Sequence, residues 1–199
     1  MINIGILGST NGTDMQAIID GIKNKTINAT INIVISNKKE SFILKRASNN
    51  NIPAHFISHK NKSREEFDKE MSTLLKTHNV NLILLIGFMR ILSKEFCYMW
   101  RDKILNVHPS LLPKYAGGMD TNVHQEVINN GDTKTGCTIH FVTEKVDAGP
   151  ILVQKSCKVD KSDTIKSLKN KVQDLEGKAF LEAINLITNQ WYVRKPKAK

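Results

Sequence analysis

The sequence predicts an α/β fold: an open, doubly wound, mostly parallel sheet, followed by an antiparallel extension and a long C-terminal helix. Three observations support this prediction. Short apolar runs alternate with amphipathic helical stretches over residues 1–110, the pattern of right-handed βαβ units. Two strand-like runs then follow each other without a helical stretch between them. Beyond residue 162, apolar residues recur at helical spacing.

Five strands are predicted in the first half of the chain. The fourth of them, LILLI, is apolar throughout, as expected for a central parallel strand that is covered on both faces. The third is the weakest of the five apolar runs. The predicted strands are residues 2–7, 31–36, 52–57, 82–86 and 104–108.

Helices are predicted between these strands. Capping-box patterns at Thr13-x-x-Gln16 and Ser63-x-x-Glu66 indicate where two of them begin. Further helices are expected from near Glu40 and from Ser93. The apolar stripes of the two capped helices consist of Met15, Ile18, Ile19 and Ile22, and of Phe67, Met71, Leu74 and Leu75.

The second half begins with two predicted strands, at residues 136–143 and 151–159. The linker EKVDAGP is short enough to join them as an antiparallel hairpin with a wide loop. Because the chain shows no repeat, low-complexity tract or interdomain linker, we expect residues 1–199 to form a single domain with a basic tail at 191–199. A helix from about Ser162 precedes that tail, and its predicted inner face consists of Ile165, Leu168, Val172, Leu175 and Ala179.

The composition is that of a globular cytoplasmic protein, with 40% apolar residues. No apolar run approaches the ~20 residues that span a bilayer. The N-terminal residues lack the basic region and cleavage site of a signal peptide. Cys97, Cys137 and Cys157 contain no CxxC pair, so we expect free thiols and neither a disulfide framework nor a metal site.

The formal net charge of +10 raises the question of nucleic-acid binding. However, the lysines are spread along the chain, and only residues 194–199 form a dense basic run. Single-strand binders interleave basic and aromatic side chains, and no such segment is present. We therefore expect no nucleic-acid or membrane partner, and a diffuse positive field also suits small anionic ligands.

Three polar loops follow predicted parallel strands, at residues 8–14, 87–93 and 106–110. Open α/β sheets bind ligands beyond the carboxyl ends of their strands, so a crevice is expected where these loops meet. Asn106 and His108 lie two apart on a strand, and their side chains therefore share one face, roughly 6–7 Å apart at the backbone. Such a pair can hold a developing oxyanion and donate a proton.

The first loop, Arg90 and Asp147 can each be explained either by a functional role or by a purely structural one. The first loop can bind a single phosphate at a helix N-terminus or can be a tight, well-capped turn. It matches neither the dinucleotide fingerprint nor the P-loop. Arg90 can meet an anionic ligand or extend its charge from the core to solvent. Asp147, in VDAGP, can hold the tautomer of His108 or can simply form a turn.

The stretch NVHPSLLP at residues 106–113, followed by DAGP at 147–150, resembles the folate-dependent formyltransferases, and the similarity runs from residue 2 to about residue 187. It implies a Rossmann-like formyltransferase fold, in which residues 1–110 bind phosphate and substrate and residues 111–190 bind folate and carry the catalytic loop. GFMRILS and NGTDMQAIID are most similar to the members that formylate glycinamide ribonucleotide. The implied reaction moves the formyl group of 10-formyltetrahydrofolate to that amine in de novo purine (IMP) biosynthesis.

The resemblance also implies roles for individual residues. The amine would attack the formyl carbon directly, and Asn106 and His108 would stabilise the tetrahedral oxyanion. Asp147 would orient His108 and help to relay a proton from the amine to the departing folate nitrogen. The implied substrate-binding residues are Asn11, Gly12, Thr13, Asp14, Arg64, Gln173 and Glu176. The implied folate-binding residues are Met89, Arg90, Ile91, Leu92, Val142, Glu144 and Val146.

The chain departs from the family pattern in two places. Asp14 stands where the family usually has asparagine, which puts a carboxyl group beside the expected phosphate. The loop after Tyr115, AGGMDTNVHQ, looks longer than the usual form, and His124 is the candidate for a histidine often found there. Whether the protein is a monomer or a homodimer is left open.

Other activities share the same three catalytic residues. A methionyl-tRNA formyltransferase normally adds a C-terminal tRNA-binding domain, and a formyltetrahydrofolate hydrolase normally adds an N-terminal regulatory domain. We expect neither domain in this chain. A non-catalytic folate or phosphate binder would not need Asn106, His108 and Asp147 together.

Overall fold

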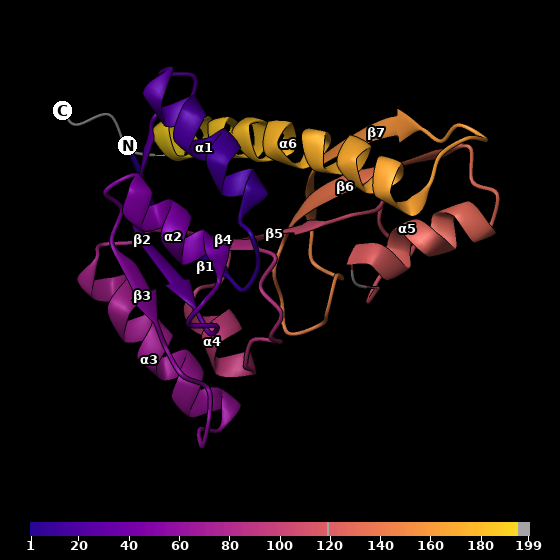
Figure 1. Ribbon diagram of the computed structural model, residues 1–199. Helices are drawn as coiled ribbons and strands as arrows, with labels where there is room; N and C mark the ends of the chain where they lie inside the picture. The colour runs from indigo at the N-terminus through magenta and orange to yellow at the C-terminus, as the bar shows by residue number, and fades with distance from the viewer. Residues whose placement is uncertain (119, 195–199) are drawn as a thin grey trace.

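The computed structural model describes residues 1–118 and 120–194, and within them one mixed sheet of seven strands runs through the molecule (Figure 1). The strands are β1 (Ile2–Gly8), β2 (Ala29–Ser36), β3 (Ala54–Phe56), β4 (Leu82–Ile86), β5 (Ile104–His108), β6 (Lys134–Phe141) and β7 (Ile151–Lys158). Their order in the sheet is β3-β2-β1-β4-β5-β6-β7. The pairs from β3 to β5 are parallel, and β6 and β7 are antiparallel. The predicted fold class and hairpin are therefore confirmed.

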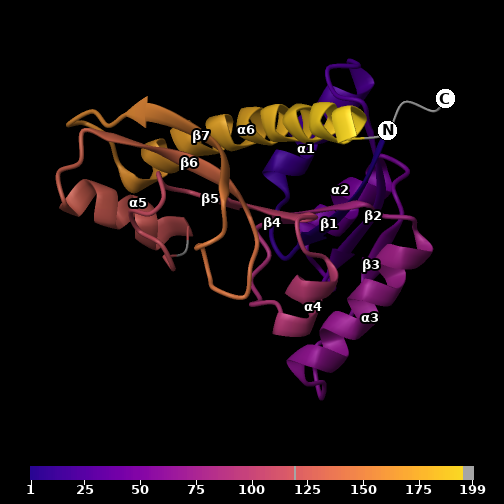
Figure 2. The same cartoon turned by 180° about the vertical axis from the view of Figure 1, so that it is seen from behind.

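Helices cover both faces of this sheet, as a doubly wound topology requires (Figures 1 and 2). One face carries α1, α2 and α6, and the other carries α3 and α4. The helix α5 packs against α6 at the β7 end of the sheet. The helices are α1 (Thr13–Lys23), α2 (Phe42–Asn49), α3 (Arg64–Thr77), α4 (Lys94–Met99), α5 (Asp120–Asn129) and α6 (Ile165–Arg194).

The two faces have separate hydrophobic cores. Met15 of α1 and Phe180 of α6 pack in the first core, and Phe67 of α3 and Trp100 of α4 pack in the second. Strand β4 contributes to both, because its alternate side chains point to opposite faces. Leu84 lies in the first core and Ile83 in the second, and every residue of β4 is buried. The prediction of a central strand covered on both sides is confirmed.

Helix starts agree with the predictions in one case and contradict them in another. At α3 the capping box is present, because the Ser63 side chain accepts from the Glu66 N–H and the Glu66 side chain accepts from the Ser63 N–H. The capping box predicted at Thr13 is wrong. Gly12 is the N-cap of α1, with φ of 65° and no side-chain cap, so Thr13 is already the first helical residue. A left-handed N-cap is readily adopted by glycine.

Three further boundaries differ from the predictions. Strand β3 has only three residues, and α6 begins at Ile165, three residues later than expected. Residues 116–125 were expected to form a loop, but residues 120–129 form the helix α5, which buries Val123 and Val127. The predicted basic tail began at residue 191, but α6 continues to Arg194, and residues 195–199 lie outside the described part.

No helix of the described residues is long and apolar enough to cross a membrane.

Candidate active site

The loops after β1 and β4 are held together at the carboxyl edge of the sheet. The Ser9 hydroxyl accepts a hydrogen bond from the Met89 N–H (3.1 Å) and donates one to Asn37 Oδ1 (2.6 Å). The Ser9 N–H also donates to the Gly87 carbonyl. The parallel strands bring these loops to one edge, and Ser9 then sets their spacing.

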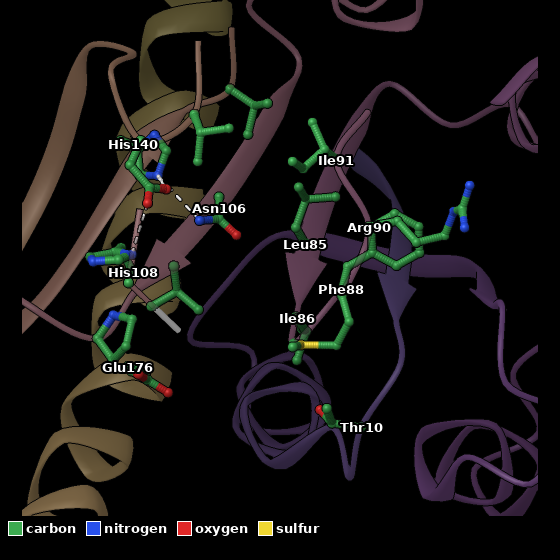
Figure 3. Close-up of a pocket in the computed structure, with 18 of the residues that line it drawn as sticks. Thr10, Leu85, Ile86, Phe88, Arg90, Ile91, Asn106, His108, His140 and Glu176 are labelled. Atoms are coloured by element: carbon green, nitrogen blue, oxygen red, sulfur yellow. Dashed lines mark hydrogen bonds and ion pairs between the residues drawn. The ribbon is translucent and has the colours of Figure 1, made fainter. Parts of the chain in front are cut away.

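A cavity of about 550 Å³ opens at this edge. The structure brings all of the predicted site residues to its lining except Gly12 and Arg64. Figure 3 shows Asn106, His108 and His140 on one side and Phe88 and Ile91 on the other. The predicted residues that line it are Asn11, Thr13, Asp14, Met89, Arg90, Ile91, Leu92, Asn106, His108, Val142, Glu144, Val146, Asp147, Gln173 and Glu176.

Asn106 and His108 come from the end of β5, where the sheet changes from parallel to antiparallel. Asn106 is paired with His140 of β6, and His108 with Thr138. His108 is 3% exposed, so its protonation depends on its immediate neighbours.

The imidazole of His108 lies between two oxygen acceptors. Its Nε2 is 2.9 Å from the Tyr115 carbonyl oxygen, and its Nδ1 is 3.2 Å from Asp147 Oδ2. Burial lowers the pKa of His108 below its ordinary value, although Asp147 and the Tyr115 carbonyl act in the opposite direction. A neutral imidazole can donate to only one of these acceptors, whereas an imidazolium satisfies both. The surroundings therefore suit a ring that gains a proton transiently.

Asp147 is positioned by the loop between β6 and β7. Its backbone has a φ of 52°, a left-handed conformation that is uncommon outside glycine but tolerated by Asp. Close by, a Cβ added to Gly149 would lie 1.8 Å from the Phe141 carbonyl oxygen, so the loop can approach β6 only because residue 149 is glycine.

The Asp147 carboxylate is ready to accept hydrogen bonds. Burial alone would raise its pKa, but the His140 ring, the Gly117 N–H at 2.8 Å and the His108 ring bring the pKa below the ordinary value. The carboxylate therefore stays ionised at neutral pH.

His140 is a site residue to which the sequence analysis assigned no role. Its Nδ1 lies 3.0 Å from the Phe141 carbonyl oxygen, so this nitrogen carries the hydrogen and Nε2 can accept one from the Asn106 amide at 3.2 Å. Nε2 is also 3.5 Å from Asp147 Oδ1. The β5–β6 register places His140 directly opposite Asn106. The sequence analysis could not identify His140 because the pairing of two strands distant in the sequence is not visible in the sequence alone.

The amide of Asn106 keeps capacity for a ligand after this contact. An amide nitrogen has two hydrogens, and His140 uses one of them. The other can be donated to an oxyanion in the cavity.

The chain that leaves β5 is anchored to β6 by one buried side chain. Thr138 Oγ1 donates to the Ser110 carbonyl (2.7 Å) and accepts from the Leu112 N–H (3.0 Å) and from Gln154 Nε2 (2.9 Å). The Leu112–Pro113 peptide bond is cis. The rigid exit from β5 thus depends on Thr138 as well as on the prolines.

The apolar wall of the cavity is the segment between β4 and α4. Met89 and Ile91 are 45% and 56% exposed, which is high for apolar residues and leaves surface for a ligand. The Ser93 N–H, at the end of this segment, donates to Asp68 Oδ2 (2.6 Å). The Arg90 guanidinium packs over the Phe67 ring, 4.7 Å from its centroid, and in Figure 3 it points away from Asn106 and His108.

The opposite end of the cavity is formed by the first turn of α1 and one face of α6. Lys169, Gln173 and Glu176 all line the cavity, because spacings of four and three residues bring side chains to one side of a helix. Lys169 is a further lining residue that the sequence analysis did not name. The backbone N–H groups at the start of α1 and a lysine on α6 together suit a phosphate.

Asp14 and Glu176 meet at this end. Both are buried, with 7% and 8% of their surface exposed. Burial raises the pKa of Asp14 to about 7, although the Glu176 side chain acts in the opposite direction.

Arg64 and His124 lie apart from the cavity lining. Arg64 is exposed on the first turn of α3, and His124 is buried on α5 with 1% of its surface exposed. Gly12 is buried at the N-cap, where a Cβ would lie 2.4 Å from Ile43, so it shapes the turn below the cavity.

The arrangement can carry out acyl transfer between two bound molecules. It has an amide that can donate to an oxyanion, a buried imidazole beside an ionised carboxylate, an apolar wall and a helix N-terminus that can bind an anion, all within one cavity.

Comparison with known proteins agrees with this chemistry. A sequence model of the formyl transferase family matches residues 2–184. Phosphoribosylglycinamide formyltransferase of Escherichia coli K12 is 39% identical over 176 residues, which are 88% of this chain and 82% of that protein. The human trifunctional purine biosynthetic protein adenosine-3 is 41% identical over 94% of this chain, which spans only 18% of that much longer protein.

Solved structures are similar over nearly the whole chain. Glycinamide ribonucleotide transformylase 1 from Symbiobacterium toebii superposes with a TM-score of 0.91 and 34% identity, covering 96% of this chain and 89% of the other. Phosphoribosylglycinamide formyltransferase from Coxiella burnetii gives a TM-score of 0.86 and 38% identity, with 92% and 85% covered.

Proposed function

Because this chain belongs to the formyl transferase family, we propose that it transfers the formyl group of 10-formyltetrahydrofolate to the amine of glycinamide ribonucleotide, a step of de novo purine (IMP) biosynthesis. One observation carries the proposal. His108 is buried between Asp147 and the Tyr115 carbonyl, beside Asn106, in a cavity with an apolar wall at one end and an anion site at the other.

The two ends of the cavity suit the two substrates. The pteridine ring of the folate would lie against the wall formed by residues 89–92, with Val142, Glu144 and Val146 beside it. The phosphate of the ribonucleotide would lie at the start of α1, near Asn11 and Thr13, with Gln173 and Glu176 on the facing helix. The formyl carbon and the amine would then meet in the middle, next to Asn106 and His108.

The reaction follows from this placement. The neutral amine attacks the formyl carbon, and the carbonyl oxygen becomes an oxyanion that accepts from the second N–H of Asn106 and is stabilised by the positive charge of a protonated His108. Asp147 stabilises the imidazolium. Collapse of the intermediate breaks the bond from the formyl carbon to the folate nitrogen, and that nitrogen takes the proton that the amine gives up.

An acceptor assay tests the proposal. The purified protein is mixed with 10-formyltetrahydrofolate and with glycinamide ribonucleotide, initiator methionyl-tRNA or buffer alone, and loss of the formyl donor is followed. We expect rapid loss only with glycinamide ribonucleotide. Formyl transfer to the tRNA, or donor loss in buffer at a comparable rate, would show that the acceptor is assigned wrongly.

A further inference from the structure

The turn between α5 and β6 contains a carboxylate, Asp132, that contacts the segment following His108. Its Oδ2 accepts a hydrogen bond from the Tyr115 hydroxyl at 2.8 Å, and its Oδ1 accepts one from the Lys114 ammonium at 2.6 Å. The Asp132 N–H donates to the Val127 carbonyl at 3.1 Å, which ties this residue to the end of α5. The carboxylate therefore joins two segments that are 17 residues apart in the sequence.

Of the two side-chain contacts of Asp132, the one with Tyr115 is the better anchor. The Lys114 side chain is 57% exposed, and an exposed ion pair contributes little stability. A hydroxyl that donates to a carboxylate makes a charge-assisted hydrogen bond, which is stronger than a neutral one. The hydrogen bond from Lys114 is the main cause that keeps the pKa of Asp132 below its ordinary value, so the acceptor of the Tyr115 hydroxyl is ionised at neutral pH. Asn130 Nδ2 also donates to this hydroxyl at 2.8 Å.

The backbone conformation of Tyr115 depends on contacts of this kind. Its φ is 61°, in the left-handed region that is unfavourable for a bulky side chain. Such a conformation persists only where the surrounding structure holds it. The hydrogen bonds of the Tyr115 hydroxyl fix the ring, and the Ser110 hydroxyl donates to the carbonyl of the preceding residue, Lys114.

The segment that Tyr115 begins contacts both members of the His108–Asp147 pair. The Tyr115 carbonyl oxygen is 2.9 Å from His108 Nε2, and the Gly117 N–H donates to Asp147 Oδ2 at 2.8 Å. The same Oδ2 is 3.2 Å from His108 Nδ1. Residues 115–117 therefore approach the pair from one side and contribute to the alignment of both side chains.

The charge of His108 depends on groups from several elements. Burial lowers the pKa of His108, Asp147 and the Tyr115 carbonyl raise it, and His140 of β6 acts in the same direction as burial. Asp147 and His140 are held by β6 and by the loop that follows it. The Tyr115 carbonyl is the acceptor that depends on the segment after β5.

We infer that Asp132 is a positioning residue for the proposed formyl transfer: by holding the Tyr115 hydroxyl, it keeps the Tyr115 carbonyl aimed at His108 Nε2 and the Gly117 N–H aimed at Asp147. The inference rests on the proposed function for the identity of the reaction. Neither Asp132 nor Tyr115 is among the described residues that line the cavity, so Asp132 acts through the backbone of residues 115–117. Without the anchor, the strained backbone can relax, and His108 loses one of its two acceptors.

The kinetic test removes the anchor from either side. Asp132→Asn keeps the shape of the side chain but loses the ionised acceptor, and Tyr115→Phe keeps the ring but loses the hydroxyl. Each should lower kcat with glycinamide ribonucleotide by about ten- to a hundredfold with little change in KM, since a small misplacement of a reacting group is costly. In the double variant the two losses should not add, because both substitutions break the same hydrogen bond. Tyr98→Phe, at a tyrosine that is 78% exposed on α4, is the matched control and should keep the wild-type kcat.

A measurement that does not depend on turnover separates positioning from simple stabilisation. The pKa of His108 is followed by NMR through its ring Cε1–H signal. Because the Tyr115 carbonyl stabilises the imidazolium, His108 should titrate at lower pH in Asp132→Asn and in Tyr115→Phe than in the wild type and in Tyr98→Phe. The melting temperature of each protein is measured alongside.

Three results would overturn the inference. They are a His108 titration at the wild-type pH in both variants, losses of kcat that add in the double variant, and a lower melting temperature as the only change. In the last case Asp132 would merely brace the loop. If the wild type formylates no glycinamide ribonucleotide, the proposed function fails, and the NMR titration still decides whether Asp132 positions the partner of His108.

Discussion

His108 lies between the Tyr115 carbonyl and the Asp147 carboxylate, and this placement determines how the site can handle a proton. Burial favours the neutral ring, while the two acceptors favour the charged one. The ring can therefore accept a proton when an oxyanion forms and release it afterwards. At the scale of single residues, the site depends on this balance more than on the presence of a histidine.

Replacing Asp147 by asparagine tests that balance. The variant loses the ionised partner of His108, and kcat should fall by about 10²–10⁴, the usual contribution of a positioned acid–base pair. Because the carboxylate raises the pKa of His108, its removal should also move the limb of the pH–rate profile that belongs to His108 to lower pH. Steady-state kinetics over a pH series measure both effects. Asp102→Asn, at an exposed position with positive φ that Asn also tolerates, serves as the control. An unchanged profile would separate Asp147 from the chemistry.

Asp14 predicts an unusual dependence of stability on pH. Its pKa is raised from 3.8 to about 7 in the folded protein, so between these values the folded chain binds more protons than the unfolded chain. The free energy of unfolding should therefore fall as the pH rises from about 4 to about 7, by up to about 4 kcal/mol for a shift of this size. Asp14→Asn should remove this fall. Urea denaturation at several pH values measures it, and parallel curves for the two proteins would contradict the account.

Part of the site could be predicted from single residues, and part could not. That Asn106, His108 and Asp147 line one cavity could be predicted, because a polar pair at the end of an apolar strand is unusual and the motif around it resembles a family, and their catalytic roles stay a prediction. His140 was missed because its role exists only through the pairing of β5 with β6. Arg64 was assigned to the substrate, yet it is exposed and does not line the cavity, since a family position says nothing about where a side chain points.

At the scale of secondary structure, the β5–β6 pair positions the proposed catalytic residues Asn106 and His108. Thr138 connects the two strands to the segment that follows His108, through hydrogen bonds to Ser110 and Leu112. The precision of the site therefore depends on a residue that is paired with His108 but does not itself line the cavity.

Thr138→Val tests this connection with a side chain of similar shape. The Ser110 carbonyl and the Leu112 N–H lose their partner, and each buried group left unsatisfied costs about 1–3 kcal/mol. We expect a lower melting temperature and a lower kcat, because the segment after His108 is free to shift. Thr135→Val, near the other end of β6, should leave kcat close to that of the wild type. If Thr138→Val lowers stability without changing kcat, the segment does not aim His108.

Elements with strong local signals were predicted well, and elements that depend on long-range contacts were not. The Ser63 capping box and the buried strand β4 follow from neighbouring residues. The helix α5 was missed because its apolar stripe is short, with Val123 and Val127 as its buried residues, and because it follows two glycines. Its stability depends on packing against α6. The cap of α1 was misassigned because Gly12, in a left-handed conformation, takes the N-cap position instead of Thr13.

At the scale of the whole molecule, the doubly wound sheet brings distant loops to one edge, and the net charge of +10 gives the molecule an overall positive field. The doubly wound, mostly parallel sheet could be expected from strand–helix alternation, but the order of its strands was not predicted. The depth of the cavity could not, because it depends on the side chains of α6 and of the β6–β7 loop that close it.

The positive field predicts salt dependence for anionic substrates. Raising NaCl from about 20 to about 200 mM shortens the screening length, so kcat/KM for the phosphorylated substrate should fall severalfold. Initial rates at low substrate concentration measure this, and sucrose at matched viscosity controls for diffusion. A kcat/KM that is independent of salt would mean that the overall charge has no part in substrate capture.

The measurement that tests the central claim most directly is kcat of Asn106→Ala with both substrates saturating. Loss of one oxyanion donor should lower kcat by about 10²–10³ while the melting temperature stays near that of the wild type. Asn122→Ala, on the exposed surface of α5, should change neither quantity. A folded Asn106→Ala protein with a kcat within a few-fold of the wild type would contradict the assignment of this cavity as the place where the formyl group is transferred.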